Sequence, residues 1–430
     1  MSHRINRVLW LTAVLLLAIT TLIRQQQLLA QSTLSPSGGT AVPCQNGTAV
    51  GYPCDRVDLL SFASKIDLGA TITNSLVANL WGWTDPETGS EYVILGLQEG
   101  TAFVDVSNPL TPTYLGLLPT HFLTATLSPF RDMKVYQNYA YIIADAPSQN
   151  GMQIFDLTTL RGITTPTTFS ETAHYAGIVD GHNIFIHQDT GYAYVVRRGA
   201  GTCNTGTVMI DLQDPLNPVD AGCYGDGGIA SDLQCVLYHG PDPDYQGREI
   251  CAIASDDNVV VGDVTSKTNP VTLAIRPYHN AARSHSAWFT ADHRYFLSVD
   301  MDDEHHYGSN TRVFIWDASD LDNIPQDPVI YTGPTTGSDH NIWVVGDYAY
   351  IGNLRAGLRI LDLRHIAEGT LTQAAYFDNF APSNAAGHEQ GAWAVYPYFE
   401  SGVIAISDRT EGLFLVRPLL QQTFLPMVSK

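Results

Sequence analysis

A repeat of about 50 residues runs through most of this 430-residue chain and constrains its fold more than any other feature. Each copy consists of a glycine turn, an apolar stretch and an aspartate, as in GTAFVDVSNP, GMQIFDL and GTVMIDLQDP. The aspartates are Asp105, Asp156, Asp211, Asp263, Asp317 and Asp362, and Arg417 takes their place in a seventh copy. Their spacings are 51, 55, 52, 54, 45 and 55 residues. A period of this length indicates one structural unit repeated seven times.

The units are predicted to consist of β-strands. Segments rich in β-branched and aromatic residues, such as YAYIIAD, GYAYVV and RYFLSVD, precede the repeated aspartates. Another strand comes before each of these, and a fourth follows the turn, as in TPTYLGLLP. Four antiparallel strands per unit is the size of a propeller blade, and the 3.6-residue period of helical repeats is missing. We therefore predict an all-β fold, a seven-bladed β-propeller of four-stranded antiparallel blades.

The seventh unit ends after its third strand, at Pro418, and the segment VDLLSFASKIDL precedes the first unit. We expect this N-terminal strand to supply the outer strand of blade seven, so that the ring is closed and has no exposed edge. The predicted organisation is a signal peptide at 1–30, an N-terminal disulfide-containing segment at 31–56, the propeller at 57–418 and a short C-terminal tail at 419–430. The repeated aspartates are expected to accept backbone N–H groups of the turns that follow them.

The N-terminus predicts export. Arg4 and Arg7 precede an apolar run from residue 8 to residue 23, and a small residue, Ala30, follows a polar stretch. This is typical of a secretory signal cleaved near Ala30, although Leu28 at the position that prefers a small residue leaves an uncleaved anchor open. We expect a secreted or surface-associated extracellular protein without a membrane span in its mature chain.

The charge limits the class of partner. The net charge of −21 comes from acidic residues scattered along the chain, which repel nucleic acid and anionic lipid. The expected partner is an extracellular protein, a glycan or a small molecule, and the chain is expected to be a monomer. Six cysteines after an export signal predict disulfides, although fifteen connectivities are possible. Pairing between sequence neighbours is favoured, which joins Cys44 to Cys54, Cys203 to Cys223 and Cys235 to Cys251.

The first strand of each unit begins with a polar residue, and in a propeller these strands line the central channel. The predicted ring consists of Asn79, Asp132, His182, Asp232, His285, His340 and Gln390. All seven are candidate ligand-binding residues, and no catalytic residue is identified among them. Its imidazoles and carboxylates, at Asp132, His182, Asp232, His285 and His340, could also hold a divalent metal such as calcium or zinc. The alternative is that they hydrogen-bond backbone groups and water.

Several segments are similar to a known family. CQNGTAVGYPCDRVDLL, QCVLYHGPDPDYQGREIC and DHNIWVVGDYAYIGNLRAGLRILDL resemble the choice-of-anchor B family, which is related to LVIVD-repeat propellers. The resemblance extends from about Cys44 to Arg417, and it implies an extracellular propeller without an assigned biochemical activity. It also supports local disulfides at Cys44–Cys54 and Cys235–Cys251. The chain departs from the family because it shows no C-terminal hydrophobic anchor or sorting domain after Pro418.

The sequence leaves two hypotheses about function. Common hydrolase and nucleotide-binding motifs are absent from the sequence, which favours a non-enzymatic binding or scaffold module. The alternative is a metal-dependent hydrolase, similar in logic to lactonase or phytase propellers, with its site in the central channel. In that case His388 or Glu389 would carry protons.

Overall fold

The computed structural model describes residues 39–121, 127–145, 151–196, 203, 206–380, 383–387 and 390–420. The predicted signal peptide, residues 421–430 of the predicted tail, and both His388 and Glu389 lie outside this range. Within it, none of the helices is long and apolar enough to cross a membrane.

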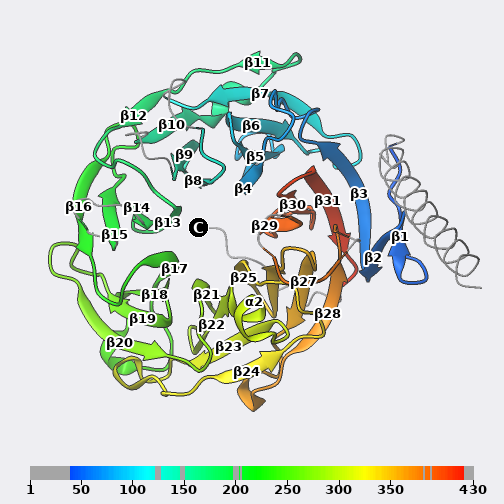
Figure 1. Cartoon of the computed structure of the whole chain (residues 1–430). Helices are drawn as coiled ribbons and strands as arrows, with labels where there is room; N and C mark the ends of the chain where they lie inside the picture. The colour runs from blue at the N-terminus through cyan, green and yellow to red at the C-terminus, as the bar shows by residue number, and fades with distance from the viewer. Residues whose placement is uncertain are drawn as a thin grey trace, which may run out of the picture.

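Seven antiparallel sheets form a ring around a central channel, which confirms the predicted seven-bladed propeller (Figure 1). From the channel outward, blade 1 consists of β4 (Val77–Thr84), β5 (Glu91–Leu97), β6 (Gly100–Asp105) and β7 (Thr113–Pro119). Blade 2 consists of β8 (Arg131–Tyr136), β9 (Tyr139–Ala144), β10 (Met152–Asp156) and β12 (Ala173–Tyr175). Blade 3 consists of β13 (Asn183–His187), β14 (Tyr192–Val196), β15 (Thr207–Asp211) and β16 (Val219–Tyr224). Blade 4 consists of β17 (Ala230–Leu237), β18 (Glu249–Ser255), β19 (Asn258–Asp263) and β20 (Val271–Pro277).

The remaining blades follow the same order. Blade 5 consists of β21 (Ser284–Phe289), β22 (Tyr295–Asp300), β23 (Arg312–Asp317) and β24 (Val329–Thr332). Blade 6 consists of β25 (Asn341–Val345), β26 (Tyr348–Gly352), β27 (Leu358–Asp362) and β28 (Thr372–Phe377). Blade 7 consists of β29 (Ala392–Tyr396), β30 (Ile404–Asp408), β31 (Gly412–Pro418) and β3 (Val57–Ser64). A short helix, α2 (Asp303–Tyr307), follows β22.

The ring is closed by the N-terminal strand, as predicted. β3 pairs antiparallel with β31, from Val57 opposite Pro418 to Ser64 opposite Gly412. Val57 and Leu59 are fully buried in this sheet. Two blades carry additional edge strands that the repeat did not predict. The hairpin of β1 (Thr48–Ala49) and β2 (Tyr52–Asp55) extends blade 6, and β11 (Thr167–Thr168) runs parallel to β7 at the edge of blade 1.

Apolar side chains pack mainly between neighbouring blades, because both faces of each sheet are covered. Phe103 of blade 1 stacks on Phe155 of blade 2, with ring centroids 4.4 Å apart. The predicted role of the repeated aspartates is confirmed. All six end a strand and accept the backbone N–H two residues later, as Asp211 does from Gln213 at 2.8 Å. These turns give the first six blades the same exit from the third strand.

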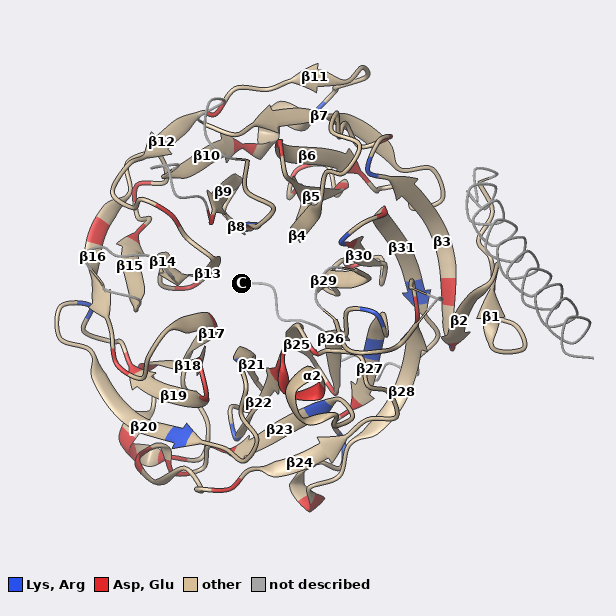
Figure 2. Cartoon of the chain, viewed as in Figure 1, with Lys and Arg blue, Asp and Glu red and all other residues tan. Residues whose placement is uncertain are grey.

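The predicted disulfides are also confirmed. Cys44–Cys54 spans the hairpin of β1 and β2, and Cys203–Cys223 ties the segment before β15 to β16. Cys235 and Cys251 are directly opposite each other in β17 and β18. Acidic residues are distributed around the whole ring (Figure 2).

Closure by β3 leads to a test by truncation. A chain that begins at Lys65 lacks β3 and leaves β31 as an unpaired, apolar edge. We expect this chain to aggregate or to lose cooperative thermal unfolding in circular dichroism. A chain that begins at Val57 is the matched control, because it keeps β3 and loses the hairpin, its disulfide and the bridge between Val42 and Leu59, and it should still unfold cooperatively. Equal melting curves for the two chains would contradict the closing role of β3.

Candidate functional site

The first strands of the seven blades, β4, β8, β13, β17, β21, β25 and β29, line the central channel (Figure 1). Their side chains divide the channel into layers. Histidines lie near the beginnings of the strands, a layer of amides and carboxylates comes next, and aromatic rings follow. A funnel opens beyond these rings, at the ends of the strands.

Three members of the predicted polar ring, Asn79, His182 and His340, line one small cavity. Its volume of about 10 Å³ is just sufficient for one water molecule. The other lining residues are Phe130, Arg131, Asn183 and Trp393. This end of the channel is therefore nearly filled by side chains.

The three predicted histidines gather in the channel wall. The rings of His285 and His340 are 4.1 Å apart, and those of His182 and His285 are 6.4 Å apart. Nδ1 of His285 lies 2.6 Å from the backbone oxygen of His340, and Nδ1 of His182 lies 3.0 Å from Asp145. Burial lowers the pKa of His340, so its imidazole is neutral at pH 7.

The two predicted aspartates take part in separate contacts. Asp132 forms a buried ion pair with Lys134 at 2.9 Å and accepts the backbone N–H of Ile184 from the next blade at 2.9 Å. Asp232 accepts a hydrogen bond from the hydroxyl of Ser286 at 2.9 Å. Burial raises the pKa of Asp232 to about 7, although Lys134 counteracts the shift. Gln390 lies just before β29.

The residues that join the aspartates in the polar layer are partly different from those that spacing predicted. Asn183, and not His182, accepts a hydrogen bond from Asn79 at 3.1 Å. Ser286, and not His285, reaches Asp232, and its oxygen also accepts the backbone N–H of Ile342. The first strands of blades 1, 4, 5 and 7 contain β-bulges, and the one in blade 5 lies between Ser284 and Ser286, at the position of His285. Spacing alone does not reveal such a shift.

Metal binding by the ring stays a prediction, and the hydrolase hypothesis stays with it. In the part of the chain that the structure describes, one group of three possible ligands has all its ligand atoms within 4.8 Å of one another. That group is His121, Glu171 and His174, outside the predicted ring.

Below the polar layer, five aromatic side chains block the channel, and we call them the aromatic plug. They are Trp81, Phe185, Trp288, Trp343 and Tyr396. Ring centroids are 4.6 Å apart for Trp288 and Trp343 and 5.1 Å apart for Trp81 and Tyr396. Gly82 permits this packing, because a Cβ at that position would lie 2.1 Å from the ring of Tyr396. The ammonium of Lys134 lies 4.6 Å from the centre of the Trp81 ring.

The plug forms the floor of an open funnel of about 680 Å³, which residues from all seven inner strands line. Aromatic lining comes from Trp81, Trp83, Phe185, Trp288, Tyr396 and Tyr398, and polar lining includes His187, Gln188, Asp189, Gln234, His239 and His293. A volume of this size with mainly apolar walls and a few polar groups is typical of small-molecule sites. We did not predict this site from the sequence. The signal was present in the aromatic residues of the inner strands, in WGW, IFIH, SAWF and AWAVY.

Two imidazoles of the funnel lining, those of His187 and His293, are neutral at pH 7. Burial lowers the pKa of His187, and it lowers the pKa of His293 to about 4. Nδ1 of His187 accepts the backbone N–H of Thr190, and Nδ1 of His293 accepts that of His239. The proton of each neutral ring is therefore on Nε2. Within the described residues, the buried hydroxyl of Tyr398 has no hydrogen-bond partner.

The pH dependence of stability tests whether Asp232 is buried in the polar layer. Its raised pKa means that the folded state keeps a proton that the unfolded chain releases near pH 4, so stability falls as pH rises from about 4 to about 7. We expect Asp232→Asn to raise the free energy of unfolding above pH 7 by about 1–2 kcal/mol and to have little effect near pH 4.

Asp132→Asn is the matched substitution. It leaves the buried ammonium of Lys134 without its carboxylate, and should lower the free energy of unfolding by about 3 kcal/mol. Urea unfolding at pH 5 and pH 8 would separate the two effects. Destabilisation by both substitutions at pH 8 would contradict the assignment of a buried, protonatable carboxyl to Asp232.

Comparisons with known proteins agree with the repeat and the fold. The LVIVD repeat model matches residues 130–158 and 336–364, which contain the first three strands of blades 2 and 6. No curated protein matches the chain. A solved structure titled Kuenenia stuttgartiensis hydrazine synthase is similar in fold, with a TM-score of 0.55 and 14% identity, over 81% of this chain and 98% of that one. The chain is thus a seven-bladed propeller that contains LVIVD repeats.

Proposed function

We propose that this protein is a ligand-binding module whose ligand occupies the aromatic funnel. The observation that carries the proposal is the funnel itself, about 680 Å³ of open volume with an aromatic floor, lined by residues from all seven inner strands. The ring closure holds these walls in place, so the site is formed before a ligand arrives. A preformed site loses less entropy on binding.

The chemistry of the lining selects the class of ligand. Aromatic faces bind flat apolar surfaces, and the neutral imidazoles of His187 and His293 donate hydrogen bonds without adding positive charge. A sugar ring has both an apolar face and hydroxyl groups that accept such bonds. The funnel therefore suits a neutral glycan.

Charged ligands fit less well. The ammonium of Lys134 already occupies the face of Trp81, so it would repel a second cation stacked there. The carboxylate of Asp189 at the funnel and the net charge of −21 disfavour anions. A neutral ligand avoids both penalties.

We propose that the protein acts outside the cell. We also propose that it belongs to the choice-of-anchor B family. Three disulfides and the LVIVD repeats support this, since disulfides persist in oxidising compartments. The predicted signal peptide at 1–30 supplies the export route.

An array of neutral, sialylated and sulfated oligosaccharides tests the proposal. We expect the protein to bind neutral members, and Phe185→Ala to weaken that binding at least tenfold, or about 1.4 kcal/mol, because it removes a half-buried stacking surface. His187→Ala should weaken binding by a smaller factor through the loss of one donor.

Tyr307→Ala is the control, because this exposed aromatic lies on α2 and is absent from the funnel lining. Melting temperatures of all variants would show that the fold is retained. Failure to bind any neutral glycan, or binding that Phe185→Ala leaves unchanged, would contradict the proposal that the funnel is a glycan-binding site.

A further inference from the structure

A second cluster with metal-binding chemistry lies at the outer edge of blades 1 and 2, where β7, β11 and β12 meet (Figure 1). It consists of His121, Glu171 and His174. His121 follows the end of β7, Glu171 lies in the turn between β11 and β12, and His174 is the central residue of β12. After β10 of blade 2, the chain forms β11 at the edge of blade 1, and it then forms β12, the outer strand of blade 2.

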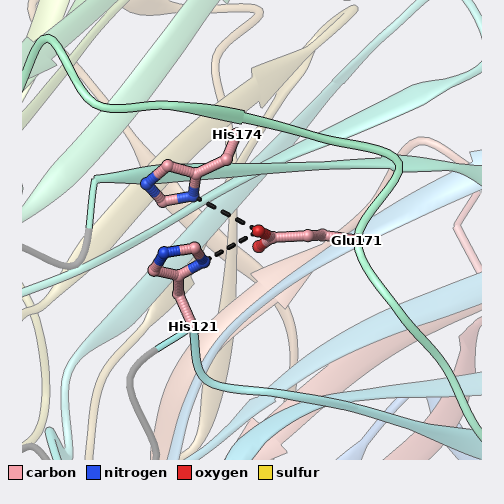
Figure 3. Close-up of side chains that lie close together, drawn as sticks. All are labelled: His121, Glu171 and His174. Atoms are coloured by element: carbon pink, nitrogen blue, oxygen red, sulfur yellow. Dashed lines mark hydrogen bonds and ion pairs between the residues drawn. The ribbon is translucent and has the colours of Figure 1, made fainter.

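Both imidazoles turn a nitrogen toward the same carboxylate oxygen (Figure 3). Nδ1 of His121 is 2.7 Å from Oε1 of Glu171, and Nδ1 of His174 is 3.6 Å from the same atom. Neighbouring ligand atoms around a tetrahedral zinc ion are about 3.3 Å apart, given metal–ligand distances near 2.0–2.1 Å. The two observed separations lie on either side of that value, so small side-chain movements would admit the ion.

The surroundings hold each ligand in place. Gln153 is opposite His174 in the pairing of β10 with β12. Its amide donates to Oε2 of Glu171 at 2.9 Å and to the backbone oxygen of Pro119 at 3.1 Å, which leaves Oε1 for the imidazoles. Outer contacts of this kind fix the orientation of metal ligands. On the other side of His174, a Cβ at residue 151 would lie 2.4 Å from Nε2, so the glycine at this position leaves room for the ring.

An ordinary hydrogen-bonded cluster explains these contacts less completely. The two imidazole rings are stacked with centroids 3.7 Å apart, and among the described residues the buried Nδ1 of His174 has no hydrogen-bond partner. A proton shared with Glu171 satisfies His121, but it does not reach Nδ1 of His174 at 3.6 Å. A cation among the three ligand atoms satisfies all of them.

We propose that His121, Glu171 and His174 form a zinc site that fastens the crossover segment β11–β12 to the end of β7. Two nitrogen ligands and one carboxylate select zinc over calcium or magnesium, which prefer oxygen ligands. The three side chains are 26%, 22% and 18% exposed, so water can occupy the fourth position. The site is separate from the funnel and does not depend on the proposed glycan binding.

Zinc binding to the intact, disulfide-bonded protein is the direct test. Protein stripped with a chelator and dialysed against zinc should retain one equivalent by elemental mass spectrometry, and zinc should raise its melting temperature. Glu171→Gln and His174→Gln should each weaken zinc binding at least tenfold in titration calorimetry. The cobalt form should show the visible absorption of tetrahedral coordination, and both variants should lose it.

His365→Ala is the matched control, because His365 and Glu368 form an exposed histidine–glutamate pair with the same sequence spacing as His174 and Glu171. Its zinc affinity should equal that of the unmodified protein. Equal melting temperatures of the metal-free proteins would show that the substitutions spare the fold. The proposal is overturned if tenfold excess zinc leaves no bound metal, or if the ligand variants bind zinc as tightly as His365→Ala does.

Discussion

Closure of the ring by β3 is the constraint on which the rest of the structure depends. Pairing of β3 with β31 joins the two ends of the propeller and gives blade 7 its fourth, outer strand. Because the ring is closed, the seven inner strands must share one narrow channel, and their side chains must fill it. The polar layer and the aromatic plug fill the channel one after the other, and the funnel is the part that stays open.

The layers have different physical roles. Asp132 and Ser286 each accept a backbone N–H from the inner strand of the next blade, so the polar layer joins neighbouring blades. The aromatic plug separates this layer from solvent at the funnel end, and it thereby maintains the burial that raises the pKa of Asp232. One end of the channel is thus nearly filled by side chains, whereas the other provides open, aromatic volume for a ligand.

The sequence predicted the fold well because the repeat reports local structure. The period gave seven blades, the incomplete seventh unit gave the closing strand, and the aspartate positions gave the turns, as Asp211 and Gln213 illustrate. The channel was harder to predict, because β-bulges exchange His285 for Ser286 in the polar layer without changing the spacing. The cluster of His121, Glu171 and His174 could not be predicted, since it depends on the additional strand β11, which precedes Glu171 and His174 in the chain and pairs with β7 close to His121.

Binding in the funnel can be observed directly through the tryptophans, which sit at distinct levels of the molecule. Protein labelled with 5-fluorotryptophan, with signals assigned by single Trp→Phe substitutions, would be titrated with a neutral oligosaccharide and followed by fluorine NMR. Trp81, Trp83 and Trp288 line the funnel, Trp393 lies at the opposite end of the channel, and Trp316 is buried in blade 5. Our account predicts that the Trp81 and Trp288 signals shift while those of Trp393 and Trp316 stay in place. A shift confined to Trp393, or no shift at saturating ligand, would contradict it.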